Sequence, residues 1–375
     1  MPGLLPDVDP DGLLEYSVVY TDRALNHMSQ KFQRVMNDLS ATLKTVYHGR
    51  SAIIVPGSGT FGMEAVARQF ATGKQVLVVR NGWFSYRWSQ IFQMGGVVAG
   101  ETVLKARRVG DGSQAAFAPA PIAEVVAAIE RERPAVVFVP HVETASGMIL
   151  PEDYLRAIAK AVRAVDGLFV VDCVASGTIW LDMAAIGIDV LISAPQKGWS
   201  GSPCCALVML GDRARERIES TQSSSYSCDL RKWLQIMEAY ESGGHLYHAT
   251  LPTDSLASLR DTMQETAALG FETVREAQQA LGTKVRALLA TAGFPSVAAP
   301  GFEAPGVVVS YTSDPDIHSG KKFRDLGLQT AAGVPLQCDE PADFRTFRIG
   351  LFGLDKLQNV DRTVTTLENA LAKLR

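Results

Sequence analysis

Short runs of apolar residues alternate along most of the chain with segments whose apolar residues recur at helical spacing. Strands that are buried on both faces have such near-continuous runs, because helices cover both faces of a parallel sheet. The pattern therefore predicts an open α/β sheet with helices on both sides. Six runs fit this description: Ser51–Val55, Val76–Val79, Ala135–Val139, Leu168–Val171, Val190–Ile192 and Ala206–Leu210.

The intervening segments have the signals of helices. Pro151-Glu152-Asp153 opens one of them with proline and acids in the first turn. Leu155, Ile158 and Val162 lie on one side of this helix at three- and four-residue spacing and are expected to face the sheet.

The pattern changes after about Leu251. Residues Thr253–Ala292 have helical spacing, and Val307–Tyr311 and Thr346–Ile349 have the composition of strands in a smaller α+β unit. One closing helix is predicted from an apolar stripe formed by Leu357, Val360, Val364, Leu367 and Leu371.

These changes predict three parts: an N-terminal arm at 1–22, a large domain at 23–265 and a small C-terminal domain at 266–375. A chain of 375 residues is long enough for two hydrophobic cores. Its 36 basic and 40 acidic residues argue against a nucleic-acid partner, which would favour a basic surplus. No apolar run reaches the length of a membrane span. The acidic, proline-containing start and five cysteines without a disulfide framework predict a cytoplasmic protein.

Three features at predicted strand ends carry candidate chemistry. The motif Gly57-Ser58-Gly59-Thr60-Phe61-Gly62 follows the first strand and opens a helix, so its backbone N–H groups can bind an anion. Asp172 ends another strand, where the carboxyl ends of parallel strands bind ligands. Lys197 lies beyond a third strand among uncharged residues, and an enclosed lysine becomes an amine nucleophile.

Taken together, these features match the needs of pyridoxal phosphate (PLP). The lysine forms the Schiff base, the acid pairs with the pyridine nitrogen and the helix end holds the phosphate. The glycine motif alone also permits a nicotinamide-dependent dehydrogenase. The acid that would bind the cofactor ribose is missing, however, because the next strand ends in Arg80-Asn81.

The ordered motifs from about His27 onward resemble the class V aminotransferases, most closely the alanine–glyoxylate and serine–pyruvate aminotransferase branch. That family has the PLP-dependent transferase fold of type I, a large domain with a mostly parallel sheet and a smaller C-terminal domain. Besides the glycine motif, the resemblance rests on Asn81–Arg87, His141–Gly147, Val171–Ser176, Gln196-Lys197, Tyr247–Thr250 and Phe347–Gly350.

The resemblance implies a role for each matching residue. Lys197 is the Schiff-base lysine and the acid/base of the proton shift, and Asp172 pairs with the pyridine nitrogen. Arg348 binds the substrate carboxylate with a bidentate fork. Phe84 and Val174 cover the two faces of the ring, and Thr144 donates to its phenolic oxygen. The phosphate ligands are Ser58, Gly59, Thr60 and Gln196, with Tyr247 and Thr250 from a partner subunit, so a homodimer is expected.

Several histidines and one cysteine are further candidate site residues with less support from the sequence. His245 and His248 lack further ligands at metal-binding spacing, so no metal is predicted. His27 and His141 are expected to be structural or to form hydrogen bonds near the site. Cys338 could in principle attack sulfur as in cysteine desulfurases, but it lies too near Arg348 to match that pattern well.

Two segments depart from the family, and both bear on substrate choice. Where the family has an N-terminal Pro-Gly-Pro stretch, this chain has Tyr20–Ala24. Where the family has a proline-rich segment after the lysine, this chain has Gly201-Ser202-Pro203-Cys204-Cys205. The expected reaction is ping-pong transamination between a small amino acid, alanine or serine, and glyoxylate or pyruvate. Alternatives within the fold are 2-aminoethylphosphonate–pyruvate transamination, cysteine desulfuration and a β-lyase activity. A binding protein on a decayed scaffold is a further alternative.

Overall fold

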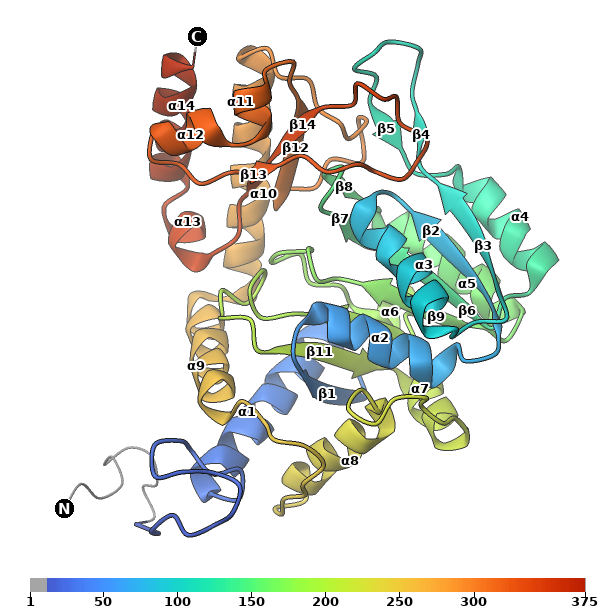
Figure 1. Cartoon of the computed structure of the whole chain (residues 1–375), viewed down its shortest axis with the longest axis vertical. Coiled ribbons are helices and arrows are strands. Elements are labelled where there is room, and N and C mark those ends of the chain that lie inside the picture. Colours follow the sequence, from blue (N-terminus) through green and yellow to red (C-terminus); the bar gives the residue numbers. More distant parts are fainter. Residues whose placement is uncertain (1–11, 375) are drawn as a thin grey trace.

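A seven-stranded sheet forms the centre of the computed structural model, which describes residues 12–374 (Figure 1). Residues 1–11 of the predicted arm therefore lie outside the described part. Strand β11 is antiparallel to both of its neighbours, and the remaining strand pairs are parallel. The strand order is β1 (Ser51–Pro56), β11 (Cys205–Leu210), β10 (Val190–Ser193), β9 (Leu168–Asp172), β6 (Val136–Pro140), β2 (Gln75–Arg80) and β3 (Gly100–Lys105).

Helices cover both faces of this sheet, as the apolar pattern predicts. Helices α2 (Gly59–Phe70), α3 (Trp83–Gly95) and α8 (Leu230–Glu241) lie together over one face. Helices α4 (Ile122–Glu132), α5 (Glu152–Ala164) and α6 (Met183–Ile186) lie over the other, and the face of α5 that carries Leu155, Ile158 and Val162 is buried. The predicted open α/β sheet is confirmed.

The remaining elements of this part are an edge strand, a long helix and short pieces. The strand β3 was not predicted, because it is only partly buried and its sequence mixes charged and apolar residues. Helix α1 (Gln30–Tyr47) packs against β1, α8 and α9 (Thr253–Leu269). The short pieces are β4 (Arg107–Arg108), β5 (Phe117–Ala118), β7 (Val142–Glu143), β8 (Met148–Ile149), α7 (Asp212–Arg217) and the 3-10 helix η1 (Ile218–Ser220).

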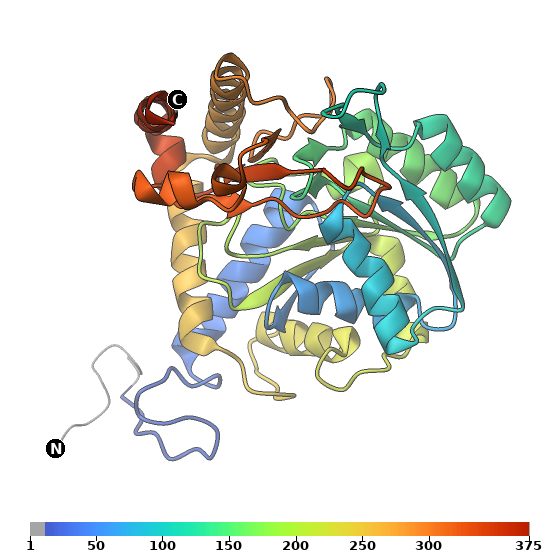
Figure 2. The same cartoon turned by 45° about the horizontal axis from the view of Figure 1, so that its top comes forward.

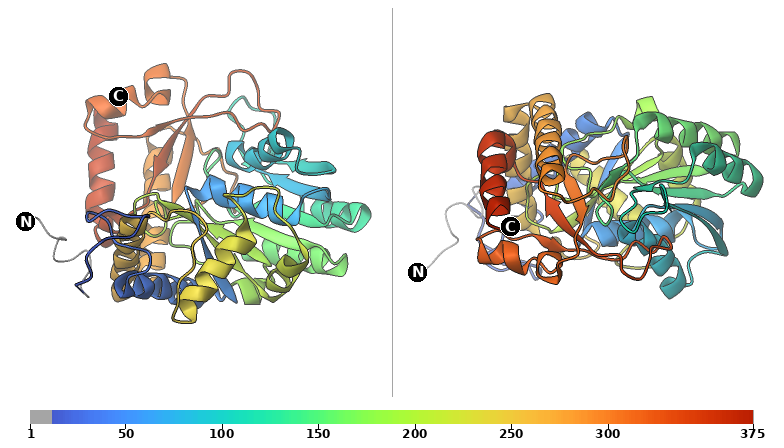
Figure 3. Two further views of the ribbon diagram at one scale, coloured as in Figure 1. Left: turned by 60° about the horizontal axis from the view of Figure 1, so that its bottom comes forward. Right: turned by 90° about the horizontal axis from the view of Figure 1, so that it is seen from above.

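A second, antiparallel sheet lies beside long helices at one end of the molecule (Figure 3). Its strands, in order, are β12 (Val307–Tyr311), β14 (Thr346–Gly350) and β13 (Ala331–Ala332). The predicted helical region 253–292 forms α9 and α10 (Phe271–Thr291), which meet at Gly270 with a φ of +91°. The break falls there because a positive φ ends the helix and suits glycine. The short helices α11 (Pro315–His318) and α12 (Lys321–Asp325) follow β12.

The prediction of one closing helix is wrong in detail. The apolar stripe is divided between α13 (Leu354–Gln358) and α14 (Val360–Lys373). Asn359 separates them with non-helical angles (φ −131°, ψ 53°), and its carbonyl accepts a hydrogen bond from the Thr363 N–H at 3.0 Å. The Asn359 side-chain amide donates to the Asp355 carbonyl of α13 at 2.8 Å and so stabilises the break.

The connection between β13 and β14 crosses to the carboxyl ends of β2 and β3 (Figure 2). The Cys338 thiol donates to the Arg80 carbonyl at 3.4 Å, and Lys105 forms an ion pair of 2.6 Å with Asp339. These contacts fix the second sheet, and with it Arg348 on β14, over the edge of the main sheet. Within residues 12–374, no helix has the length and apolar character needed to cross a membrane.

Candidate active site

Most of the predicted site residues follow parallel strands at one edge of the main sheet. Ser58 follows β1, Phe84 follows β2, and Thr144 lies shortly after β6. Asp172 is the last residue of β9, and Lys197 lies in the turn after β10. Because parallel strands end at the same edge, side chains far apart in sequence meet there.

The start of α2 forms a loop with little bulk around its backbone donors. Ser58 precedes the helix without its hydroxyl capping it, so that hydroxyl is available to a ligand. A Cβ on Gly59 would lie only 2.8 Å from Val174 Cγ2, so glycine fits best where the start of α2 packs against Val174, two residues after β9. The Phe61 and Gly62 N–H groups both donate to the Ser58 carbonyl, which leaves those of Gly59 and Thr60 at the open helix end.

Asp172 is a buried carboxylate with one partner in the protein backbone. Asp172 is 8% exposed, and its Oδ1 accepts a hydrogen bond from Val174 N–H at 2.9 Å. Burial raises the pKa of Asp172 to about 6, and the bond from Val174 and the charge of Arg87 oppose this effect. A buried carboxylate is stabilised by a cationic ligand, and a protonated ring nitrogen provides one.

The Lys197 amine is partly enclosed and faces an aromatic ring. Its Nζ lies 4.9 Å from the ring centroid of Phe352, two residues after the end of β14. Burial lowers the pKa of Lys197, and the nearby positive charge of Arg348 lowers it further. The neutral amine, which is the nucleophilic form, is therefore more populated than for a lysine in water.

Arg348 reaches the same region from the second sheet. It lies in the middle of β14, between Val309 on β12 and Ala331 on β13. Its Nε donates to the Ala332 carbonyl at 2.8 Å, and its guanidinium carbon lies 5.6 Å from the ring centroid of Phe84. Because Nε is held by the backbone, the Nη1/Nη2 pair is oriented for a carboxylate.

Glu143 is a buried residue of the site to which the sequence pattern assigned no role. Its side chain is fully buried and accepts four hydrogen bonds: from the N–H of Phe84 (3.2 Å), Ser85 (2.9 Å) and Ala145 (2.9 Å), and from the Ser85 hydroxyl (2.6 Å). Three of these four donors belong to the first turn of α3, where a carboxylate also meets the positive helix end. Glu143 thereby fixes the backbone that carries Phe84. The sequence signal was its place within the motif His141–Gly147, a few residues after a buried strand.

Replacing Glu143 by glutamine is expected to destabilise the fold by about 2–3 kcal/mol. The reason is that the NH2 group of glutamine would face backbone N–H groups that now donate to the carboxylate. Urea unfolding of the cofactor-free protein measures this loss. Glu132→Gln is the matched control, since Glu132 is exposed and pairs with its neighbour Arg131. Equal unfolding midpoints for the two variants would contradict the role of Glu143.

The chemistry of this edge fits pyridoxal phosphate. The side-chain oxygen of Gln196, next to Lys197, is buried without a hydrogen-bond partner in the described part of the chain, so its amide is not engaged by the protein. Neutral donors at the start of α2 suit a phosphate, and Asp172 suits a ring nitrogen. The uncommitted amine of Lys197 suits an aldehyde. Gln196, Val174 and Thr144 each lie beside a strand end at this edge.

The structure does not bring Tyr247 and Thr250 to Lys197. Both are exposed, and their hydroxyls bond one another at 3.1 Å. The Tyr247 ring lies 5.6 Å from that of His27, at the side of the molecule that holds the N-terminal segment. Their predicted place in a partner's site stays a prediction.

His141 and His248 each form a hydrogen bond within the protein. His141 is buried, its Nδ1 lies 2.7 Å from the Ser176 hydroxyl, and burial lowers its pKa to about 3, so it stays neutral. His248 Nε2 bonds the Tyr226 carbonyl at 2.8 Å. Among residues 12–374, no group of three His, Cys, Asp or Glu side chains is arranged to hold a metal.

Cys338 is unsuited to attack on a substrate sulfur. It is 3% exposed, and its thiol is directed at the Arg80 carbonyl. Burial raises the pKa of the Cys338 thiol to about 12, so almost no thiolate forms at neutral pH. This environment disfavours the desulfurase alternative.

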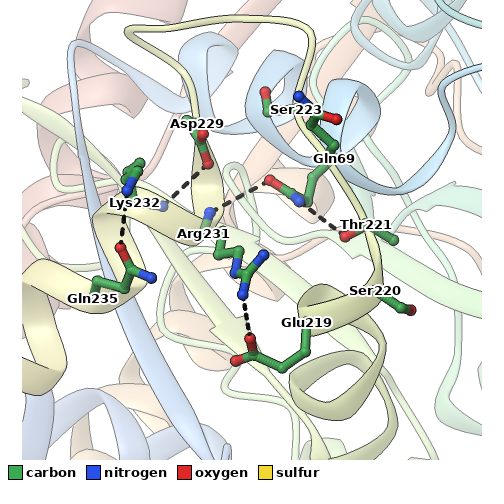
Figure 4. Close-up of a pocket in the computed structure, with 10 residues that line it drawn as sticks. Gln69, Glu219, Ser220, Thr221, Ser223, Asp229, Arg231, Lys232 and Gln235 are labelled. Atoms are coloured by element: carbon green, nitrogen blue, oxygen red, sulfur yellow. Dashed lines mark hydrogen bonds and ion pairs between the residues drawn. The ribbon is translucent and has the colours of Figure 1, made fainter.

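A separate hollow of about 520 Å³ lies between the end of α2, η1 and the start of α8 (Figure 4). Its side chains bond mainly one another. Gln69 donates to the Thr221 hydroxyl at 2.8 Å, and Arg231 pairs with Glu219 at 2.8 Å. Lys232 N–H donates to Asp229 at 3.1 Å. The hollow lies away from the strand ends and takes no part in the site.

Known aminotransferases are similar to this chain in sequence and in structure. The family model for class V aminotransferases matches residues 13–314. Alanine–glyoxylate aminotransferase of Rattus norvegicus is 24% identical over 364 residues, covering 93% of this chain and 82% of that protein. A 2-aminoethylphosphonate–pyruvate transaminase of Burkholderia ambifaria is 28% identical and covers 94% and 92%, respectively. The structure of a ureidoglycine–glyoxylate aminotransferase from Bacillus subtilis superposes with a TM-score of 0.76 at 23% identity, covering 92% and 87%.

Proposed function

Because the chain belongs to the class V aminotransferase family, and is thus a PLP-dependent aminotransferase, we propose that it moves the amino group of alanine or serine to glyoxylate or pyruvate. The observation that carries the proposal is the convergence of Lys197, Asp172 and Arg348 at one sheet edge. Arg348 acts electrostatically on Lys197, and Phe84 contacts Arg348. The branch of the family is supported by the alanine–glyoxylate aminotransferases among the relatives.

Pyridoxal phosphate, when bound, supplies an aldehyde that takes up amino groups and a ring that withdraws electrons from the substrate α-carbon. Asp172 would hold the proton on the ring nitrogen, and this requires its ionised form. Phe84 and Val174 would cover the ring faces, while Thr144 would donate to the phenolic oxygen. Ser58, Gly59, Thr60 and Gln196 would bind the phosphate through neutral donors.

Lys197 would hold the cofactor through Nζ and then act as the base at the substrate α-carbon. Its lowered pKa supports this role, because a neutral amine can accept the α-proton and return it during the second half-reaction. Arg348 would bind the α-carboxylate and so hold the α-proton within reach of Nζ. Phe352 lies against Nζ and would limit water there.

Three further features belong to the proposal. The exposed hydroxyls of Tyr247 and Thr250 support a homodimer in which each subunit completes the phosphate site of the other. All five cysteines are free thiols, in keeping with a cytoplasmic location. We also propose the division into an arm (1–22), a large domain (23–265) and a small domain (266–375). The break at Gly270 lies close to the second boundary.

A substrate panel tests the proposed specificity. Alanine, serine, cysteine and 2-aminoethylphosphonate are offered as donors, each with glyoxylate and with pyruvate as acceptor. The proposal predicts the highest kcat/KM for alanine or serine with one of these acceptors. If 2-aminoethylphosphonate with pyruvate were clearly preferred, the specificity would be that named for the Burkholderia relative.

Arg348→Ala is expected to raise the KM for alanine by about 10- to 100-fold, because a bidentate charge-assisted pair with the carboxylate is lost. Steady-state kinetics with varied alanine measures the change. Arg345→Ala is the matched control, since Arg345 is exposed and bonds the Ser313 carbonyl. An unchanged KM in the Arg348 variant would remove this residue from substrate binding.

A further inference from the structure

The residues proposed to bind the cofactor phosphate carry no positive charge. Ser58, Gly59, Thr60 and Gln196 are neutral, as are the hydroxyl groups expected from a partner. A phosphate monoester carries a charge of about −1.5 to −2 at pH 7. The start of α2 offers only about half a positive charge. The phosphate therefore needs a cation that this set of residues does not provide.

Arg87 lies next to this set, and within the described residues no carboxylate forms a hydrogen bond with it. It belongs to the second turn of α3 and is half-buried. Its Nη1 donates to the Thr60 hydroxyl at 3.0 Å, and its guanidinium carbon lies 5.2 Å from the ring centroid of Phe84. None of the ion pairs in residues 12–374 includes Arg87; its charge acts on the Asp172 carboxylate without a bond to it. Only one of its five N–H groups is used by a described side chain.

The hydrogen bond from Arg87 to Thr60 is directed so that the positive charge of Arg87 can act on a phosphate through the Thr60 hydroxyl. Because Thr60 Oγ1 accepts from Arg87, the hydroxyl proton is free to be donated to another group. Thr60 is the second residue of α2, beside the backbone donors of the open helix end. A hydroxyl polarised by a guanidinium is a stronger donor than an isolated one.

We propose that Arg87 supplies the positive charge that balances the cofactor phosphate, acting through the Thr60 hydroxyl. This inference rests on the proposed function, since it takes the start of α2 as the phosphate site. Arg87 is a positioning residue, because it acts through Thr60. Its contact with Phe84 joins the phosphate end of the site to the side chain expected to stack on the ring.

The test compares pyridoxal phosphate with pyridoxal, which lacks the phosphate. Binding of each compound to the cofactor-free protein is measured by quenching of tryptophan fluorescence. Arg87→Gln is expected to weaken the binding of pyridoxal phosphate by about 10- to 100-fold and to leave that of pyridoxal nearly unchanged. Arg87→Lys is expected to restore part of the loss, because the charge is kept. Inorganic phosphate should raise the Tm of the wild-type protein but not of Arg87→Gln.

Further variants separate this role from a structural one. Thr60→Val should show the same selective loss, and the effects of Thr60→Val and Arg87→Gln should not add in the double variant. The Thr60 variant decides the question if Arg87→Gln does not fold. Arg68→Gln is the control, since Arg68 lies on α2 but pairs with Glu64. Equal losses for both compounds, or no loss, would overturn the role of Arg87. Failure of the wild-type protein to bind pyridoxal phosphate at all would instead overturn the proposed function.

Discussion

Replacing Lys197 by alanine is expected to lower the rate of amino transfer by at least about 10⁴-fold. The variant loses both the amine that binds the cofactor aldehyde and the base for the α-proton, and proton transfer alone contributes about 10²- to 10⁴-fold. Single-turnover kinetics with alanine and a saturating amount of pyridoxal phosphate measure the loss.

The control for this variant is Lys160→Ala, because Lys160 is an exposed residue of α5. Since Lys197 lies in a turn and is only partly buried, its removal should leave the Tm of the cofactor-free protein nearly unchanged. Transamination by the Lys197 variant at the wild-type rate would refute the assignment, and so would equal losses in the two variants.

Asp172→Asn is expected to lower kcat by about 10²- to 10³-fold, because an amide cannot stabilise a positive charge on the ring nitrogen. The control is Asp189→Asn. Asp189 is also buried, but it precedes β10 at the opposite edge of the sheet and binds Arg213 and the Phe169 N–H. This control should lower stability and keep kcat. A normal kcat in the Asp172 variant would exclude its pairing with the cofactor.

The raised pKa of Asp172 adds a pH test. The Asp172 carboxyl group has a pKa of about 6 in the folded protein and an ordinary value of 3.8. Between pH 3.8 and about pH 6, folding is therefore accompanied by the uptake of a proton at this group. The cofactor-free protein therefore loses stability as the pH rises through this window. Because the neutral acid cannot pair with a pyridinium, affinity for pyridoxal phosphate should fall by up to about tenfold per pH unit below pH 6. Asp172→Asn should lack this component. A wild-type protein with the same profile as the variant would contradict it.

The main sheet could be predicted from the sequence because its strands are buried on both faces. Each of the six apolar runs lies within a strand or differs from it by one residue at an end. The edge strand β3 was not predicted because a strand that is only partly buried has a mixed sequence. The break at Asn359 was not predicted because the apolar stripe continues across it.

The residues of the site could be predicted where their chemistry is unusual for their position. A lysine or an acid at the end of a buried strand is such a signal, and the ordered motifs supplied the rest. Glu143 and Arg87 lay within those motifs, but their roles depend on contacts with the start of α3 and with Thr60. Such contacts between separate strand ends become visible only in three dimensions.

Reduction with borohydride followed by peptide mapping identifies the lysine that binds the cofactor. The purified protein, loaded with pyridoxal phosphate, is reduced and digested, and the peptides are analysed by mass spectrometry. We expect loss of the visible absorbance and a pyridoxyl phosphate group on the peptide that contains Lys197. A protein that takes up no pyridoxal phosphate, or that carries the group on a different lysine, would contradict this expectation.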